Sequence, residues 1–480
     1  MDIELLLAHA DDGSPALPEP VPFDAAGNAP RPEERGDHED YRHDGADPNS
    51  LPDQRWGLIV PEGAAGDRLL QLVEPLRRAR REEQGEEVIV YRAAPGLGAE
   101  EASRWWSDVY QAEDLSDEDV PRYLLILGDA DLVSWELQQR LASDTFIGRL
   151  CFPAEQGYEA YVHKLLSTER RTPSGGARAL FCAVRDGSAA TRVGHAGLLS
   201  PAVSQTQKER EKGTFKAAGI EQIGEAEPLS AGELLGAAAS DQPTLLFSIS
   251  NGCGAPRAGW TSREEQLRMQ GAMVLPAGER LTAGDVAERP FLPGGAWFYF
   301  ACYGAGTPQR SAYHHWLAAM RGMGLYGGDV DSVLRSLPGK DGRPFVGALP
   351  QAALANEKGP LAVMGHVDLA WTFSFQDTAV PGRYRTSRFM DIFRTIVEGK
   401  RVGAGYFKLQ RFFNQASVDL SEMYNQDARR KAPLPPEEEK ARRLRKAMLW
   451  MLRQDLSAYV LLGDPAARLP VVPQSLERAS

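Results

Sequence analysis

The sequence predicts an α/β protein whose mostly parallel sheet is covered by helices on both faces. Three observations carry this prediction: short apolar runs without polar alternation recur along the chain, stretches with helical character separate them, and several runs end in a Gly-Asp pair or another small turn. Strands that are buried on both faces are apolar throughout, whereas a strand with one wet face alternates. Strands that alternate with helices in this way indicate a doubly wound sheet.

The predicted elements begin after an N-terminal arm over residues 1–55. From residue 11 onward this arm is rich in Pro, Asp and Gly and poor in aliphatic residues, so we expect it to be extended or weakly ordered. The first apolar runs then give strands at 56–60 and 87–91 with a helix between them. We interpret residues 56–117 as a smaller N-terminal α/β subdomain.

The main domain is predicted over residues 118–470. Its second half contains a charged, helix-forming stretch at 381–457, which we interpret as a largely helical insertion, and residues 471–480 are a tail. Seven further apolar runs are predicted strands, at 123–129, 145–152, 179–184, 244–250, 296–304, 361–365 and 458–464.

The bulk composition excludes several classes of function. The chain has 480 residues, of which 42% are hydrophobic and 25% charged, as in ordinary globular proteins. Its formal net charge of −12 argues against binding to nucleic acids or anionic membranes, because both need a basic surface. Four cysteines without CxxC spacing, no signal peptide and no membrane-length apolar run predict a cytoplasmic protein. No cofactor fingerprint or metal motif occurs, so we expect neither.

Two strand ends carry the residues of chemical interest. The segment "WFYFACYGAGTP" delivers Cys302 onto a turn of small residues, and "TLLFSISNGCGAP" places Asn251 and Gly252 at the end of a similar strand. Ligands of such sheets bind beyond the carboxyl ends of the strands. A thiol beside free backbone N–H groups suits attack on a carbonyl carbon. The alternative is that Cys302 is a small core residue, which is how we interpret Cys182.

These two motifs resemble the catalytic core of the caspase-like cysteine peptidases of clan CD, in particular the prokaryotic gingipain-like and CHAT branches. The resemblance implies a caspase-like sheet and hydrolysis of peptide bonds in protein substrates by a Cys/His dyad, with Cys302 as the nucleophile. In the family pattern position 251 is His, whereas this chain has Asn251. The resemblance covers roughly residues 120–470 and includes the segments "LLILGDADLVSWELQQRLASDTFIGRL", "LAVMGHVDLAW" and "LLGDPAARL".

Asn251 departs from this pattern at the position of the base, because an amide neither takes up nor releases a proton near neutral pH. Three interpretations stay open: an inactivated form of a competent protease, a natural pseudo-enzyme, or a protease that uses another histidine. We favour the first, since the setting of Cys302 is intact. The candidate for the third is His366 in "MGHVDLAW", for which a role as pocket wall is the alternative.

The resemblance also implies a pocket for the substrate residue before the cleaved bond. In gingipain-like relatives an acidic residue just before the "GR" strand receives a basic side chain, and Asp144 in "ASDTFIGR" matches it. A partly buried carboxylate pairs well with Arg or Lys, so we expect cleavage after these residues. Asp368 is a second acidic candidate, Trp371 a candidate aromatic wall, and His366 a further pocket residue. A turn-capping Asp144 and a core Trp371 are the alternatives.

Prokaryotic caspase-like proteases often act in antiviral defence or cell death, so the resemblance implies an upstream activating protease or sensor as a partner. If the chain is a zymogen, we expect processing in the stretches 261–292 and 425–445, which contain Arg or Lys and which we interpret as exposed. Two other functions compete. One is a catalytically inactive caspase-like scaffold that binds a protein partner, and the other is a small-molecule hydrolase or transferase.

Overall fold

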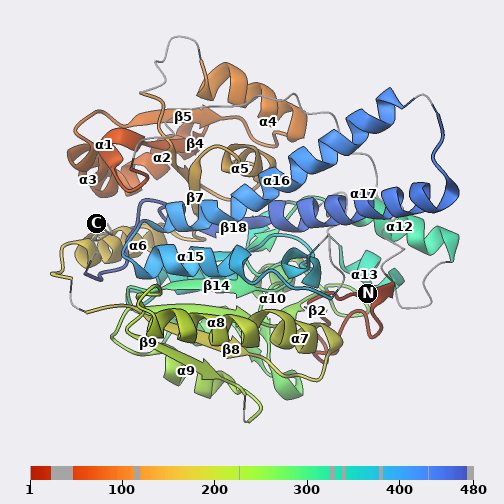
Figure 1. Cartoon of the computed structure of the whole chain (residues 1–480). Coiled ribbons are helices and arrows are strands. Elements are labelled where there is room, and N and C mark those ends of the chain that lie inside the picture. The colour runs from red at the N-terminus through yellow and green to blue at the C-terminus, as the bar shows by residue number, and fades with distance from the viewer. Residues whose placement is uncertain are drawn as a thin grey trace.

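A ten-stranded sheet forms the centre of the protein. The computed structural model describes residues 2–22, 47–112, 119–173, 175–225, 227–324, 330–337, 342–377, 382–430 and 432–472. The strand order is β5-β4-β6-β7-β18-β17-β14-β10-β8-β9, and helices lie on both faces (Figure 1). This arrangement confirms the predicted α/β class with a mostly parallel sheet. The strands are β4 (Trp56–Pro61), β5 (Ile89–Ala93), β6 (Tyr123–Leu127), β7 (Phe146–Leu150), β8 (Arg178–Ala183), β9 (Gly219–Ile223), β10 (Thr244–Ile249), β14 (Ala296–Phe300), β17 (Ala362–His366) and β18 (Tyr459–Leu462).

The sheet consists of two parallel halves that run in opposite directions. One half contains β5, β4, β6, β7 and β18, and the other contains β17, β14, β10, β8 and β9. The halves meet where β17 and β18 pair antiparallel, with Val363 opposite Leu462. The carboxyl ends of β10, β14 and β17 therefore lie together at one edge of the sheet, which is where ligands of such sheets bind.

Helices cover the first half on both faces because its strands are apolar on both. Along β6, Leu125 belongs to the main hydrophobic cluster, whereas Leu124 and Ile126 belong to a second cluster on the other face. Helices α2, α3 and α6 are part of the first layer, and α4 and α5 of the second. The helices of this half are α1 (Leu51–Gln54), α2 (Ala64–Leu72), α3 (Glu74–Gln84), α4 (Ala99–Trp105), α5 (Trp135–Ala142) and α6 (Glu155–Glu169).

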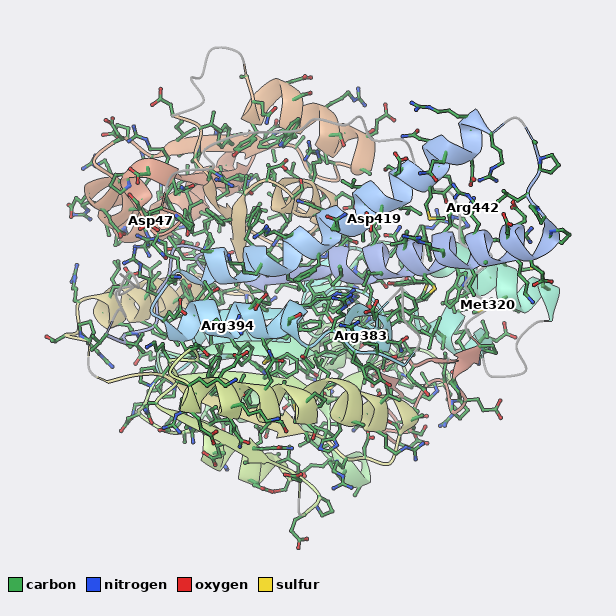
Figure 2. The ribbon with its side chains drawn as sticks, in the orientation of Figure 1. Asp47, Met320, Arg383, Arg394, Asp419 and Arg442 are labelled. Atoms are coloured by element: carbon green, nitrogen blue, oxygen red, sulfur yellow. The ribbon has the colours of Figure 1, made fainter. Side chains whose placement is uncertain are left out.

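In the second half, α15 packs through Phe389 and Phe393 on aromatic rings of β8, β10 and β14. Arg394, labelled in Figure 2, joins α15 to Glu209 of α8 at 2.8 Å. Trp297 of β14 points to the opposite face, where its ring lies 5.0 Å from that of Phe291. The helices of this half are α7 (Ala189–Gly194), α8 (Ser200–Glu211), α9 (Ala231–Ala238), α10 (Arg263–Met269), α11 (Ala283–Ala287), α12 (His314–Met323), α13 (Val330–Ser336), α14 (Ala348–Ala355) and α15 (Ser387–Val397).

The predicted helical stretch 381–457 forms α15, α16 (Val402–Arg429) and α17 (Pro436–Ser457). Helices α16 and α17 pack on each other as a long hairpin whose tip extends past the sheet (Figure 1). Near that tip, the carboxylate of Asp427 on α16 contacts Arg442 and Lys446 on α17, at 2.5 Å each.

The N-terminal segment differs from the predicted weakly ordered arm. Residues 2–22 fold onto the core through the short strands β1 (Asp2–Ile3), β2 (Leu7–Ala8) and β3 (Val21–Pro22), and Leu5, Leu6 and Leu7 are buried. Residues 23–46 of the predicted arm lie outside the described residues. The sequence signal fails here because the run "IELLL" is short and stands before a Pro-rich stretch.

Two further features of the fold bear on the predictions. Strand β9 was not predicted, because "GIEQI" mixes polar and apolar residues and lies half-buried at the sheet edge. Strands β4 and β5, from the predicted 56–117 subdomain, lie in the same sheet as β6, while the domain boundaries stay predictions.

The described part of the chain holds no helix with the length and apolar character needed to cross a membrane. The remaining short strands are β11 (Gly252–Cys253), β12 (Met273–Val274), β13 (Arg280–Leu281), β15 (Gly306–Thr307) and β16 (Phe345–Val346).

Candidate active site at two strand ends

The structure brings Asn251, Gly252 and Cys302 together, and we call these three residues the strand-end cluster. Strands β10 and β14 are neighbours in register, with Ile249 opposite Phe300, so positions 251 and 302 follow at the same level. The two main chains touch, since a Cβ on Gly252 would lie 1.9 Å from the carbonyl oxygen of Cys302. Only glycine fits at 252 because of this contact, as the glycine-rich sequence of the turn suggests.

Two backbone N–H groups of the strand-end cluster converge on one carbonyl oxygen. The N–H of Gly252 donates to the carbonyl of Leu6 at 2.8 Å, and the N–H of Cys302 donates to the same oxygen at 3.1 Å. Two amide donors aimed at a single oxygen beside a thiol are the arrangement that stabilises an oxyanion in acyl transfer. Here they bind a carbonyl that the N-terminal segment of the same chain supplies.

The Cys302 thiol is fully buried and has its hydrogen bonds with Ala370, in the turn after β17. The Ala370 N–H donates to Sγ at 3.1 Å, and Sγ lies 3.6 Å from the Ala370 carbonyl oxygen. Burial raises the pKa of the Cys302 thiol well above its ordinary value, and the N–H groups of Ala370 and Leu6 oppose this rise only in part. The thiol is therefore neutral, and a neutral thiol is a poor nucleophile.

The Asn251 side chain turns to the other neighbour of β10, the loop after β8. Its Nδ2 group donates to Asp186 Oδ2 at 2.7 Å and to Ser188 Oγ at 3.2 Å. Asp186 is in turn held by the backbone N–H of Ser188 and by the hydroxyl of Thr191. Asn251 Oδ1 is buried without a hydrogen-bond partner among the described residues. Asp186 and Ser188 therefore accept hydrogen bonds from a donor group at position 251, and no described residue donates one to the amide oxygen of Asn251.

Sequence reasoning missed two residues of this site, Asp186 and Leu6. Asp186 follows the end of β8 in "AVRDGS", so the rule that ligands gather at carboxyl ends of parallel strands could have found it. Leu6 gives no such signal, because its contribution is a backbone carbonyl. His9 also proves to be buried, with Nδ1 3.1 Å from the Ala255 carbonyl oxygen and Nε2 3.2 Å from Ser332 Oγ.

His366, the candidate substitute base, has both ring nitrogens engaged. Its Nε2 lies 3.2 Å from Asp455 Oδ1 on α17, and its Nδ1 lies 2.8 Å from the carbonyl oxygen and 3.1 Å from the amide nitrogen of Asp368. Burial raises the pKa of the Asp455 carboxyl, and His366 counteracts this rise. These contacts give no support to His366 as the base for Cys302. Among the described residues, no histidine hydrogen-bonds the Cys302 thiol.

The predicted pocket residues do not form one open pocket. The Asp368 carboxylate is buried and accepts the N–H groups of Ala312 and Leu369. Trp371 is also fully buried, with its ring 5.6 Å from that of Tyr313. Its backbone forms an antiparallel bridge with Leu5, so position 371 meets the N-terminal segment through the main chain.

Asp144 lies outside the strand-end cluster. It precedes β7, which β18 and β17 separate from β14 in the sheet. Its carboxylate pairs with Arg140 at 2.9 Å, one helical turn earlier. Asp144 thus lies in the short turn between α5 and β7, and its role in a substrate pocket stays a prediction.

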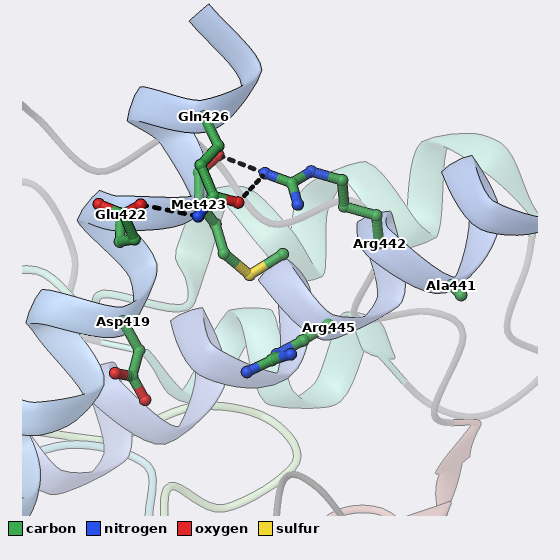
Figure 3. A pocket seen from close by; sticks show the side chains of 7 residues that line it. All are labelled: Asp419, Glu422, Met423, Gln426, Ala441, Arg442 and Arg445. Carbon is green, nitrogen blue, oxygen red and sulfur yellow. Dashed lines mark hydrogen bonds between the residues drawn. The ribbon is translucent and has the colours of Figure 1, made fainter. Parts of the chain in front are cut away.

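The open cavities lie elsewhere. A cavity of about 370 Å³, which we call the hairpin cavity, lies between α16 and α17. Five of the seven residues that line it are charged or polar. In Figure 3 Arg442 donates hydrogen bonds to the Met423 carbonyl and to the Gln426 side chain. No group of three metal-ligating side chains occurs in the described part of the chain. The residues lining the hairpin cavity are Asp419, Glu422, Met423, Gln426, Ala441, Arg442 and Arg445.

Comparison with known proteins gives partial similarities. No protein-family model and no curated protein matches the chain. The solved structure of the Arg-specific cysteine proteinase gingipain R is similar over 87% of this chain and 78% of its own, at 12% identity and a TM-score of 0.48. A structure described only as a protease covers 86% of this chain and 78% of its own, at 10% identity and a TM-score of 0.46. The structure of the separase–securin complex of Saccharomyces cerevisiae is similar over 72% of this chain and 15% of the matched chain, at 10% identity and a TM-score of 0.33.

Proposed function

We propose that the strand-end cluster is the active site of a cysteine endopeptidase, present in this chain in a form that lacks its base. One observation carries the proposal: the N–H groups of Gly252 and Cys302 bind one carbonyl oxygen, 2.8 and 3.1 Å away, beside the Cys302 thiol. A peptide carbonyl bound in this way has its oxygen polarised next to a nucleophile.

The chemistry needs a histidine at position 251. Its imidazole would donate one N–H to Asp186, in place of the Asn251 amide, and the second nitrogen would take the proton from Cys302 Sγ. The sulfur then bonds the carbonyl carbon, and the oxyanion is held by the N–H groups of Gly252 and Cys302. When the C–N bond breaks, the imidazolium gives its proton to the leaving amine, and water hydrolyses the thioester. Asp186 is a positioning residue in this scheme.

A second function is favoured by the burial of the site. Cys302 and Asn251 are both 0% exposed, and the Leu6 carbonyl already occupies the two amide donors. A site of this kind can bind an extended peptide without cleaving it. The second candidate is therefore a catalytically inactive caspase-like scaffold that binds a protein partner.

The finer expectations stay predictions. Cleavage after Arg or Lys rests on Asp144, whose carboxylate forms an ion pair with Arg140 at 2.9 Å. A defence or cell-death role, an upstream activator and a cytoplasmic location rest on the resemblance and on composition. Of the expected processing stretches, 261–292 is exposed only in part, because α10 has no buried residue whereas Met273 and Phe291 are buried.

Peptide cleavage by three versions of the chain tests the proposal: the chain itself, Asn251→His, and Asn251→His/Cys302→Ala. Fluorogenic peptides with Arg, Lys, Asp or Leu before the reporter group are incubated with each, with and without limited proteolysis. We expect cleavage with Asn251→His alone. Equal rates for Asn251→His with and without Cys302→Ala would reject the peptidase, and the scaffold would then be the remaining candidate.

A further inference from the structure

The N-terminal segment lies on the strand-end cluster as a peptide ligand would. We propose that residues 3–8 are an internal, displaceable ligand of the site, and that the site takes an extended peptide with an apolar side chain at the position of Leu6. This inference rests on the proposed function in so far as it identifies the cluster as a peptide-binding site. It goes further by naming the occupant and the chemistry of what can replace it.

The main-chain pairing on the first side is that of an added β-strand. The N–H of Leu6 donates to the Ala370 carbonyl at 3.2 Å, and the N–H of Thr372 donates to the Glu4 carbonyl at 3.1 Å. Leu5, between them, forms the antiparallel bridge with Trp371. Alternate residues of the segment thus bind the turn after β17, which is how an extended peptide adds to a sheet edge.

On the second side the segment pairs with the turn after β10. Leu7 and Ala8 lie parallel to β11, with Leu7 opposite Gly252. Between the two sides stands the Leu6 carbonyl, on the N–H groups of Gly252 and Cys302. A six-residue stretch therefore crosses the whole site and presents one carbonyl to the thiol.

The three central side chains of the segment are apolar. Leu5, Leu6 and Leu7 are at most 3% exposed and belong to the main hydrophobic cluster. The two carboxyl groups whose charge raises the pKa of Cys302 belong to Asp368 and Asp455, and both already accept backbone N–H groups. A basic side chain at the position of Leu6 would enter a buried apolar environment, which costs free energy without a free partner. The position therefore suits Leu or a similar residue.

The segment can leave without disrupting the ten-stranded sheet. Its strands lie outside that sheet: β1 pairs only with β3, and β2 is the edge strand of the small sheet β13-β12-β11-β2. The turn after β2 is attached to the body by exposed contacts of Arg257 with Asp12 and Ser14, at 2.8 Å each, and by the two buried hydrogen bonds of His9. Departure of the segment therefore leaves the strand pairings of the ten-stranded sheet in place.

Labelling of the cysteines resolved by residue tests the proposal in the full chain. Leu6→Arg is compared with the conservative Leu6→Met, and alkylation by N-ethylmaleimide is followed by mass spectrometry at Cys302 and at Cys182. Cys182 is the internal control, because it is equally buried in β8 and far along the chain from the segment. We expect Leu6→Arg to raise the labelling rate of Cys302 at least tenfold and to leave Cys182 unchanged.

A synthetic peptide with the sequence of residues 2–9, DIELLLAH, is then added to the Leu6→Arg chain. We expect it to restore the slow labelling of Cys302, whereas DIELRLAH does not. Cysteines that react at the same rate in both variants, or that all accelerate together, would show that the segment is a fixed part of the core. Equal protection by the two peptides would overturn the apolar preference.

Amide hydrogen exchange of the unchanged chain is a second test of whether the segment is displaceable, and it needs no variant. The amides of residues 3–8 should exchange at least tenfold faster than those of β10 and β14, and equal rates contradict a displaceable segment. Neither experiment depends on cleavage. Failure of Asn251→His to cut peptides therefore leaves the test of the internal ligand intact.

Discussion

The strand-end cluster and the hairpin cavity differ in what fills them. The hairpin cavity is open to solvent and lined by charged side chains of α16 and α17, among them Asp419 and Arg442 (Figure 2). The strand-end cluster has no opening, because Leu6 and its neighbours occupy the space above Cys302. The open cavity therefore lies in the hairpin, whereas the two converging N–H donors and the Cys302 thiol lie under the N-terminal segment.

This difference teaches that hydrogen-bond donors can mark a site that shape does not reveal. Ligand pockets are usually concave and mostly apolar with a few placed polar groups. The hairpin cavity is concave, but five of the seven residues that line it carry charged or polar groups. The strand-end cluster has two converging donors and apolar surroundings, and the N-terminal segment occupies it. Substitutions in one region at a time distinguish what each region contributes to stability and to the proposed activity.

The largest effect is expected from Gly252→Ala. The new Cβ would lie 1.9 Å from the Cys302 carbonyl oxygen and 2.9 Å from its carbonyl carbon, so the two strand ends must move apart. We expect a loss of unfolding free energy of about 3 kcal/mol, measured by urea denaturation.

Gly236→Ala in α9 is the matched control, since its Cβ meets nothing within 4 Å. This control should stabilise the chain by about 0.5–1 kcal/mol, as expected for alanine over glycine in a helix. A mild effect of Gly252→Ala would mean that the close contact of the two strand ends is not as described.

Asp186→Asn, introduced into the Asn251→His chain, comes next. Loss of the carboxylate removes the acceptor that orients the imidazole, and we expect peptide cleavage to fall by about 10- to 100-fold. The pH–rate profile is the decisive reading, because its lower limb reports the pKa of the base and should shift to lower pH. Asp186→Glu should retain more of the activity, and an unshifted profile would assign Asp186 a purely structural role.

The pH dependence of stability distinguishes the two regions further. The pKa of the Cys302 thiol is raised by burial, so the folded chain holds this proton above the ordinary thiol pKa of 9.0, whereas the unfolded chain releases it. The thiol therefore contributes stability that is complete below pH 9 and is lost as pH rises. We expect Cys302→Ala to reduce the alkaline loss by up to about 1.4 kcal/mol per pH unit. Identical slopes for both chains between pH 8 and pH 10.5 contradict a buried neutral thiol.

The smallest effect is expected in the hairpin. Arg442 and Lys446 hold the pKa of Asp427 at about 2, although burial works in the other direction. This carboxylate stabilises the hairpin above its ordinary pKa, and the contribution is lost as pH falls from about 4 to about 2. Asp427→Asn should cost about 1 kcal/mol or less at pH 7, because the pair is partly exposed. Hydrogen exchange in α16 and α17 should rise, and labelling of Cys302 should not.

The sequence predicted the fold well and the site in part. Nine strands are visible as short apolar runs; eight of them are buried on both faces, whereas β5 is a partly exposed edge strand. Strand β9 escapes because its sequence, GIEQI, mixes polar with apolar residues. Cys302, Asn251 and Gly252 come together because they follow neighbouring parallel strands, which is a local property of the sequence. Leu6 could not be predicted, since a backbone carbonyl contributed by a segment remote in sequence leaves no side-chain signature. The pairing of Asp144 with Arg140 follows from their i,i+4 spacing, whereas the pairing of His366 with Asp455, 89 residues later, leaves no sign in the sequence.

The most direct test of the central claim is the binding of a peptide aldehyde to the Leu6→Arg chain. Calorimetry compares an aldehyde that ends in the sequence Ile-Glu-Leu-Leu with the same peptide as its amide. If the site holds a carbonyl beside a thiol, Sγ adds to the aldehyde carbon, its proton moves to the oxygen, and the N–H groups of Gly252 and Cys302 hold that oxygen. We predict that the aldehyde binds at least tenfold more tightly than the amide and that Cys302→Ala removes this advantage. Equal affinities in the presence of Cys302 would contradict the claim.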